Sequence, residues 1–146
     1  MSINFLEFKQ RYNDDGYFVL KNFVSKDFIL KITNEIENSQ DSVKYFDNQN
    51  NLRRIEKLYD KGVSLIELNE KILQILKKVF NRNFLIFKDK FNSKPPGGEG
   101  FFAHYDGVFE FINSNNEKKR GWYEYGDFFV SALIAIDECN KKEWRK

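Results

Sequence analysis

The hydrophobic period of this chain changes from that of a helix to that of a strand at residues 81–83, and this change limits the possible folds. In residues 64–80, apolar side chains recur every three or four positions, which is typical of an amphipathic helix. Residues 84–93 instead alternate between apolar and polar side chains, with the period of two expected for a strand. Helical patterns followed by strand patterns predict an α+β fold, with a helical layer against a sheet.

The same reasoning predicts the other elements. We expect helices over residues 3–12 and 25–39, with Ser2 and Ser25 as N-caps, and a short helix over residues 52–59. Strands are expected over residues 17–23, 84–93, 101–109 and 127–136, the last apolar enough for burial on both faces. Residues 40–51 are predicted to form a surface loop, and residues 110–126 a long charged and aromatic excursion.

Composition predicts one soluble domain and excludes several partner classes. The chain has 146 residues, 41% of them hydrophobic, and its 24 basic and 22 acidic side chains leave a net charge of +2. This balance favours neither nucleic acid nor membrane binding. No apolar run approaches the roughly 20 residues of a membrane span. With Cys139 as the single cysteine and no signal peptide, we expect a cytoplasmic protein in which that thiol is an inert core residue.

The strongest chemical signal is His104 together with Asp106, which follow a loop rich in proline and glycine at residues 95–98. Residues two apart in a strand point to the same face, so this imidazole and carboxylate can converge on one point. They are two thirds of the facial triad that holds non-haem Fe(II). The structural alternative is a hydrogen-bonded pair at a strand end. His104 is the only histidine in the chain, so no second imidazole is available.

Two further groups have both a structural and a functional interpretation. Lys88, Lys90 and Lys94 share one side of the predicted strand, where they form either a solvated face or a contact with an anionic group. Aromatic side chains gather in the excursion, where they either anchor the loop or line the substrate side of a site. These aromatic residues are Trp122, Tyr123 and Tyr125.

Three segments resemble the phytanoyl-CoA dioxygenase family of Fe(II)/2-oxoglutarate oxygenases. Residues 15–20 (DGYFVL) before a helix resemble the family's N-terminal opening. Residues 88–98 (KDKFNSKPPGG), leading into residues 104–106 (HYD), resemble its strand, loop and metal motif. Residues 130–138 (VSALIAIDE) resemble the strand that follows. The resemblance extends over residues 14–138.

The resemblance implies a fold, a site and a reaction. The fold would be N-terminal helices packed on a partial double-stranded β-helix, which is a jelly-roll or cupin-like sheet. We therefore expect one domain over residues 1–146, with a helical buttress (1–83), β-helix strands (84–138) and an atypical tail (139–146). The resemblance implies His104 and Asp106 as iron ligands and places Lys90 or Lys94 near 2-oxoglutarate. The reaction would be hydroxylation of a small metabolite.

The chain also departs from the family pattern. The family's third ligand is a second histidine, followed by an arginine that binds 2-oxoglutarate, and both would come after Glu138. Arg145 lies in no matching context. We therefore expect that the chain is truncated, or its reading frame lost, near Asn140, and that the site is incomplete for catalysis.

Two other functions stay open. The first is a non-catalytic half-domain that self-associates or assembles with another chain through unpaired strand edges. The second is a cupin-like metabolite binder that works without iron.

Overall fold

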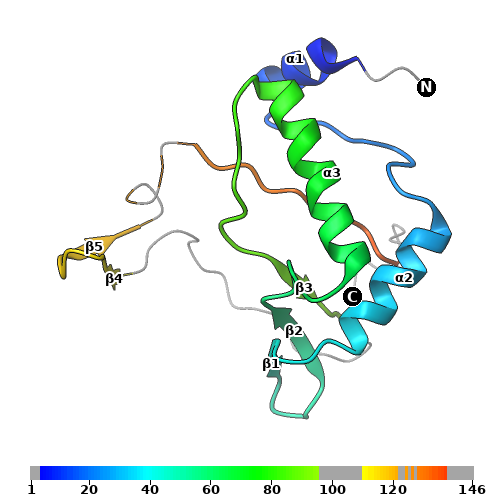
Figure 1. Ribbon diagram of the computed structural model, residues 1–146, viewed down its shortest axis with the longest axis vertical. Coiled ribbons are helices and arrows are strands. Elements are labelled where there is room, and N and C mark those ends of the chain that lie inside the picture. The colour runs from blue at the N-terminus through cyan, green and yellow to red at the C-terminus, as the bar shows by residue number, and fades with distance from the viewer. Residues whose placement is uncertain (1–3, 96–109, 122–123, 125, 127, 138–146) are drawn as a thin grey trace. The chain divides into compact units, whose positions relative to one another are not determined.

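The computed structural model describes residues 4–95, 110–121, 124, 126 and 128–137 (Figure 1). These residues divide into two compact units. The first unit holds the described residues up to 95 together with residues 136–137, and the second holds the described residues between 110 and 135. None of the helices in these ranges is long and apolar enough to cross a membrane.

Three helices belong to the first unit: α1 (Phe5–Asp15), α2 (Lys26–Glu37) and α3 (Val63–Phe80). The side chain of Asn4, not Ser2, caps α1 by accepting a hydrogen bond from the Glu7 amide at 3.3 Å. Ser25 caps α2 as predicted, through the Phe28 amide at 3.2 Å. Each cap satisfies an amide that the first turn of a helix leaves without a partner.

The first turn of α3 is capped from a neighbouring helix. Gly62 precedes α3 and has no side chain to offer, and the Glu35 carboxylate of α2 accepts hydrogen bonds from the amides of Ser64 and Leu65, both at 2.9 Å. A Cβ atom at Gly62 would overlap this carboxylate. The glycine therefore makes room for a cap that ties α2 to α3.

The core of the first unit lies where α2, α3 and the sheet meet. Ile32 of α2 and Ile55 of the central strand are each only 1% exposed. The apolar stripe predicted for residues 64–80 is confirmed as the buried face of α3. The core consists of Ile32, Ile36, Ile55, Leu58, Leu65, Leu68, Ile75, Leu76 and Val79.

The sheet of the first unit is antiparallel, with strand order β1-β2-β3. Its strands are β1 (Val43–Phe46), β2 (Leu52–Glu56) and β3 (Lys90–Asn92), and Ile55 lies opposite both Lys44 and Phe91. The helix predicted over residues 52–59 is therefore wrong, because β2 is the central strand. The loop predicted over residues 40–51 contains β1 and the turn into β2.

Both hairpins in the described residues use the same turn. The side chain of Asp47 accepts hydrogen bonds from the amides of Gln49 and Asn51 at 3.0 and 2.8 Å, and Asn50 has φ 64°. In the second unit, Asn113 accepts from Asn115 and Glu117 at 3.0 and 2.9 Å, and Asn116 has φ 61°. Short polar side chains that bond to the backbone two residues on, and asparagine in the left-handed region, suit such turns.

The second unit contains one hairpin, formed by β4 (Glu110–Ile112) and β5 (Lys118–Arg120). It lies in the excursion predicted over residues 110–126. The apolar strand predicted over residues 127–136 is not found in its described part, because no strand is assigned to residues 128–136. Leu133 is 96% exposed, which contradicts burial on both faces.

Two other predicted strands are also shorter or absent. Residues 17–23 form no strand, and Phe18 instead stacks on Phe8 of α1 at 5.0 Å between ring centres. The strand predicted over residues 84–93 is limited to Lys90–Asn92, and residues 101–109 lie outside the described residues. The described chain is a mixed α+β structure, and the double-stranded β-helix stays a prediction.

Candidate functional site

The structure describes only some of the predicted site residues. The two proposed iron ligands, His104 and Asp106, lie outside the described residues, as do Trp122, Tyr123 and Tyr125. Lys90 lies in β3 and Lys94 two residues beyond it, and both are exposed. Within the described ranges, no group of three His, Cys, Asp or Glu residues could hold a metal ion. The iron site therefore stays a prediction from the sequence.

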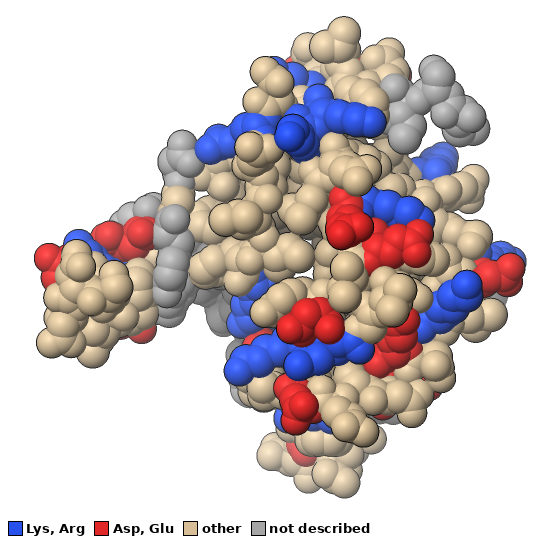
Figure 2. All heavy atoms as spheres, viewed as in Figure 1, with Lys and Arg blue, Asp and Glu red and all other residues tan. Residues whose placement is uncertain are grey.

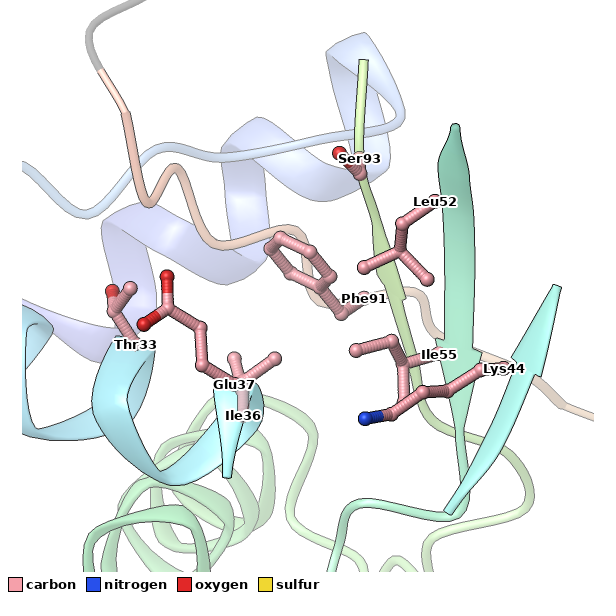
Figure 3. A pocket seen from close by; sticks show the side chains of 8 residues that line it. All are labelled: Thr33, Ile36, Glu37, Lys44, Leu52, Ile55, Phe91 and Ser93. Carbon is pink, nitrogen blue, oxygen red and sulfur yellow. The ribbon is translucent and has the colours of Figure 1, made fainter. Parts of the chain in front are cut away.

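The two faces of the three-stranded sheet differ in character. Lys44, Ile55 and Phe91, one from each strand, line a cavity against α2 (Figure 3). Because side chains alternate along a strand, their neighbours point to the opposite face. We call this opposite face the outer face. It carries Tyr45 of β1, Arg54 and Glu56 of β2, and Lys90 and Asn92 of β3.

The cavity on the helix side has a volume of about 260 Å³ and is walled mainly by apolar side chains. Figure 3 shows Phe91 and Ile55 on the sheet side and Glu37 on the α2 side. Glu37 and Lys44 carry its charges and form no ion pair with each other. The remaining lining residues are Thr33, Ile36, Leu52 and Ser93. This arrangement extends the hydrophobic core and brings together no acid–base pair.

The outer face is organised around the carboxylate of Glu56. Lys88 Nζ lies 3.2 Å and Arg54 Nη1 3.4 Å from Glu56 Oε1, and the Tyr45 hydroxyl donates to Oε2 at 3.5 Å. The Glu56 side chain is 15% exposed, so these groups meet at a largely covered carboxylate. Side chains from β1, from β2 and from the segment just before β3 thus converge on one residue.

A hollow of about 410 Å³ adjoins this cluster. Glu56 and Lys88 belong to both the cluster and the hollow, and Tyr59 and Phe87 supply aromatic walls. Four of the seven residues that line the hollow are charged, so it is more polar than the mostly apolar pockets that usually bind small molecules. Lys57, Ile86 and Asp89 complete the lining.

The backbone around this hollow is held in place by Asp89. Its carboxylate accepts a hydrogen bond from the Leu58 amide at 2.7 Å. Lys57, just before Leu58, has φ 63°, a conformation that is uncommon for a lysine. The hydrogen bond that the Leu58 amide donates to Asp89 therefore fixes the point where β2 ends and links it to the segment that enters β3.

Two residues of the outer face were missed by the sequence prediction. Arg54 and Glu56 fell within the segment predicted as a helix, which would have placed them on no common face with Lys90. The alternation of Arg54, Ile55 and Glu56 was the signal available, because polar, apolar and polar side chains in succession favour a strand. On the wider surface drawn in Figure 2, acidic and basic side chains are interspersed.

The chain is similar to two curated proteins that are dioxygenases. It is 25% identical, over 94% of its own length, to a "Probable alpha-ketoglutarate-dependent hypophosphite dioxygenase" of Stutzerimonas stutzeri. It is 29% identical, over 93% of its length, to a "2-aminoethylphosphonate dioxygenase" of the uncultured bacterium HF130_AEPn_1. These matches cover 50% and 53% of the two relatives, so the chain spans about half the length of each.

No family model matches the chain, and no solved structure matches it. The similarity supports a relation to 2-oxoglutarate-dependent dioxygenases in general, because alpha-ketoglutarate is 2-oxoglutarate. It does not distinguish the phytanoyl-CoA dioxygenase family among them.

Proposed function

We propose that this chain is part of an Fe(II)/2-oxoglutarate-dependent dioxygenase that oxidises a small phosphorus-containing anion. The observation that supports this proposal is the similarity to two dioxygenases over 93–94% of the chain. Hypophosphite and 2-aminoethylphosphonate, the compounds in their names, are both small phosphorus oxyanions. The finer sequence prediction, a hydroxylase of a small metabolite in the phytanoyl-CoA dioxygenase family, is included in this proposal.

The proposal gives roles to residues of this chain. His104 and Asp106 would hold Fe(II), and Lys90 or Lys94 would meet a carboxylate of 2-oxoglutarate, to which an ammonium offers a compact charge. Iron and 2-oxoglutarate supply the oxidising chemistry, while the protein supplies binding and orientation. Trp122, Tyr123 and Tyr125 would lie on the substrate side. The location in the cytoplasm and the absence of a nucleic-acid or membrane partner stay predictions from composition.

The proposal is tested by 2-oxoglutarate binding with and without a divalent metal. We expect calorimetric titration with Mn(II), which accepts the same nitrogen and oxygen ligands, to tighten 2-oxoglutarate binding. His104→Ala and Asp106→Ala should abolish that metal-dependent gain. Asp15→Asn, which changes an exposed carboxylate at the end of α1, is the matched control and should keep it. If Mn(II) still tightens 2-oxoglutarate binding in His104→Ala, His104 is not a metal ligand and the proposed site is wrong.

Turnover is measured as succinate release with Fe(II), O2 and either hypophosphite or 2-aminoethylphosphonate. Succinate release that depends on Fe(II) would support the dioxygenase assignment. Absence of both metal-dependent binding and turnover would remove the proposal.

A second candidate function is an assembly module without catalysis. It is favoured by the apolar side chains of residues 128–137 that lie in solvent, Leu133 above all. In addition, β1 and β3 lie at the two edges of the three-stranded sheet in the described part of the chain. A discrete oligomer by light scattering, with no metal-dependent 2-oxoglutarate binding, would favour this candidate.

A further inference from the structure

We propose that the cavity between α2 and the three-stranded sheet binds a small zwitterion, with its ammonium at Glu37 and its oxyanion at Lys44. The ligand would be a short aminoalkyl acid, a phosphonate or a carboxylate, in which an apolar chain joins the two charges. This inference goes beyond the proposed function, because it involves only described residues and requires neither iron nor 2-oxoglutarate.

Lys44 is an unusual residue for its position in the sheet. It lies opposite Ile55 in the register, and Ile55 lies opposite Phe91, so the three form one row across the strands. All three line the cavity, and Figure 3 shows Lys44 extending from β1 toward α2. A sheet face that packs against a helix is normally apolar. This lysine therefore places a positive charge at the wall of a mainly apolar cavity.

Glu37 supplies the opposite charge from α2. Thr33, Ile36 and Glu37 follow the spacing i, i+3 and i+4, so they share one face of the helix, and all three line the cavity. Glu37 is the last residue of α2, and the last turn of this helix carries no basic side chain. The C-terminal end of a helix favours positive charge. An ammonium bound at Glu37 would therefore also gain from the helix dipole.

The two charges are not neutralised by the protein. In the part of the chain that the structure describes, neither the Glu37 carboxylate nor the Lys44 ammonium forms an ion pair, and both side chains are exposed. Between them lies an apolar floor that includes Ile36 and Ile55, which are 5% and 1% exposed. Opposite charges beside an apolar floor match a molecule with opposite charges at the ends of an apolar chain.

The size of the cavity and its hydroxyl groups suit a short ligand. Its volume of about 260 Å³ is below the roughly 300–1,000 Å³ of pockets that bind drug-sized molecules. The Thr33 hydroxyl, one helical turn before Glu37, donates to the Ile29 carbonyl at 3.0 Å. Its oxygen can therefore accept a hydrogen bond from an ammonium beside Glu37.

Titration of the intact chain without metal tests the site. Three probes of similar size are compared: 2-aminoethylphosphonate has both charges, ethylphosphonate lacks the ammonium, and propylamine lacks the oxyanion. Binding is followed by NMR at neutral pH and constant ionic strength. We expect 2-aminoethylphosphonate to bind about tenfold more tightly than either of the other two, because it alone meets both side chains. Equal affinities for the three probes would overturn the proposal.

Two variants separate the two ends of the ligand. Glu37→Gln should weaken binding of 2-aminoethylphosphonate about tenfold without weakening that of ethylphosphonate, which has no ammonium to lose. Lys44→Gln should weaken 2-aminoethylphosphonate by a similar factor without weakening propylamine. Glu70→Gln on α3 and Lys31→Gln on α2 change exposed charges outside the cavity and should bind as the parent does.

The pattern of losses distinguishes a contact from a general effect on the fold. If Glu37→Gln or Lys44→Gln weakens all three probes alike, that residue meets no specific end of the ligand and the proposal is wrong. The position of the ligand is checked by intermolecular NOEs from its methylene protons to the Phe91 ring, which lines the cavity. A saturated complex without these NOEs would place the ligand elsewhere and overturn the site.

A fourth probe decides between the two oxyanions. In 3-aminopropanoate a carboxylate replaces the phosphonate, so tighter binding of either compound assigns that oxyanion to the site, and failure of both to bind removes the site. These titrations contain no metal and no 2-oxoglutarate. Their failure would leave the proposed dioxygenase function untouched, and zwitterion binding by a chain without metal-dependent 2-oxoglutarate binding or turnover would support the site alone.

Discussion

At the scale of single residues, Glu35 has the clearest physical role. Partial burial would by itself raise the pKa of its carboxyl, but the hydrogen bonds from Ser64 and Leu65 outweigh this effect and hold the pKa below its usual 4.5. A carboxyl with a depressed pKa in the folded state stabilises the protein above its unfolded pKa. That contribution is lost as the pH falls through the folded pKa.

We predict that Glu35→Gln lowers the free energy of unfolding by about 1 kcal/mol at pH 7, the usual cost of losing a helix cap. The difference from the parent should narrow as the pH falls below 4.5, because the parent carboxyl then becomes neutral as well. Urea denaturation at several pH values measures it. Glu37→Gln, two residues along the same helix, should change stability by less than about 0.5 kcal/mol at each pH. A difference in the free energy of unfolding between Glu35→Gln and the parent that does not change with pH would contradict the prediction.

At the scale of elements, the junction of α2 and α3 depends on the absence of a side chain. Gly62 has φ −170°, which any residue adopts, so its backbone does not require glycine. What requires glycine is the Glu35 carboxylate, which occupies the space of a Cβ atom. Whether a substitution at Gly62 stabilises or destabilises the protein should therefore depend on the residue at position 35.

We predict that Gly62→Ala destabilises the parent by about 1 kcal/mol, because the displaced carboxylate loses its hydrogen bonds to the first turn of α3. In a Glu35→Ala background the same substitution should be neutral or stabilising by about 0.4–1 kcal/mol. The added Cβ then meets no carboxylate and restricts the unfolded chain. Urea denaturation of the parent, the two single variants and the double variant completes the cycle. If the two changes in the free energy of unfolding are additive, the two residues do not interact.

The turn of the first hairpin gives a second prediction at this scale. Asn50 has φ 64°, a left-handed conformation that costs an alanine about 1–2 kcal/mol and a glycine almost nothing. Asn50→Ala should therefore lower the melting temperature, while Asn50→Gly should leave it unchanged or raise it slightly. Asn48→Ala, in the same turn but not in the left-handed region, is the control. If Asn50→Ala and Asn48→Ala have the same melting temperature, the turn does not have this conformation in solution.

At the scale of the whole molecule, apolar side chains are divided between a packed core and exposed positions. Ile55 is 1% exposed and Leu133 is 96% exposed, although the sequence pattern around Leu133 is the more apolar. The free energy of unfolding of a stable domain is only about 5–15 kcal/mol, so a single core residue contributes a large share of it. The two positions should therefore respond very differently to truncation.

We predict that Ile55→Ala lowers the free energy of unfolding by about 2–5 kcal/mol, through lost burial and the cavity left behind. Leu133→Ser should change it by less than about 0.5 kcal/mol. Both are measured by urea denaturation monitored by circular dichroism. A loss above about 2 kcal/mol for Leu133→Ser would show that residues 127–136 are buried, as the sequence pattern predicted.

Local patterns predicted α2 and α3 well because their apolar stripes, and the Ser25 cap of α2, are set within a few residues. Ser25 lies one residue before α2, and Leu65, Leu68 and Ile75 repeat with the helical period. The strands were harder, because a strand needs a partner that can be distant in sequence. Lys90 pairs with Glu56, which lies 34 positions earlier in the chain, and no local pattern specifies that register.

The sequence alone determined the helical faces and the mixed α+β class, and it predicts His104 and Asp106 as a pair of iron ligands. These follow from residue types and short-range spacing, which the printed chain contains in full. Only the tertiary structure decided that residues 52–56 form a central strand, that Arg54 joins Lys90 on one face, and that Glu35 caps a helix other than its own. Those outcomes depend on contacts between distant segments, whose free energies are settled by packing rather than by local preference.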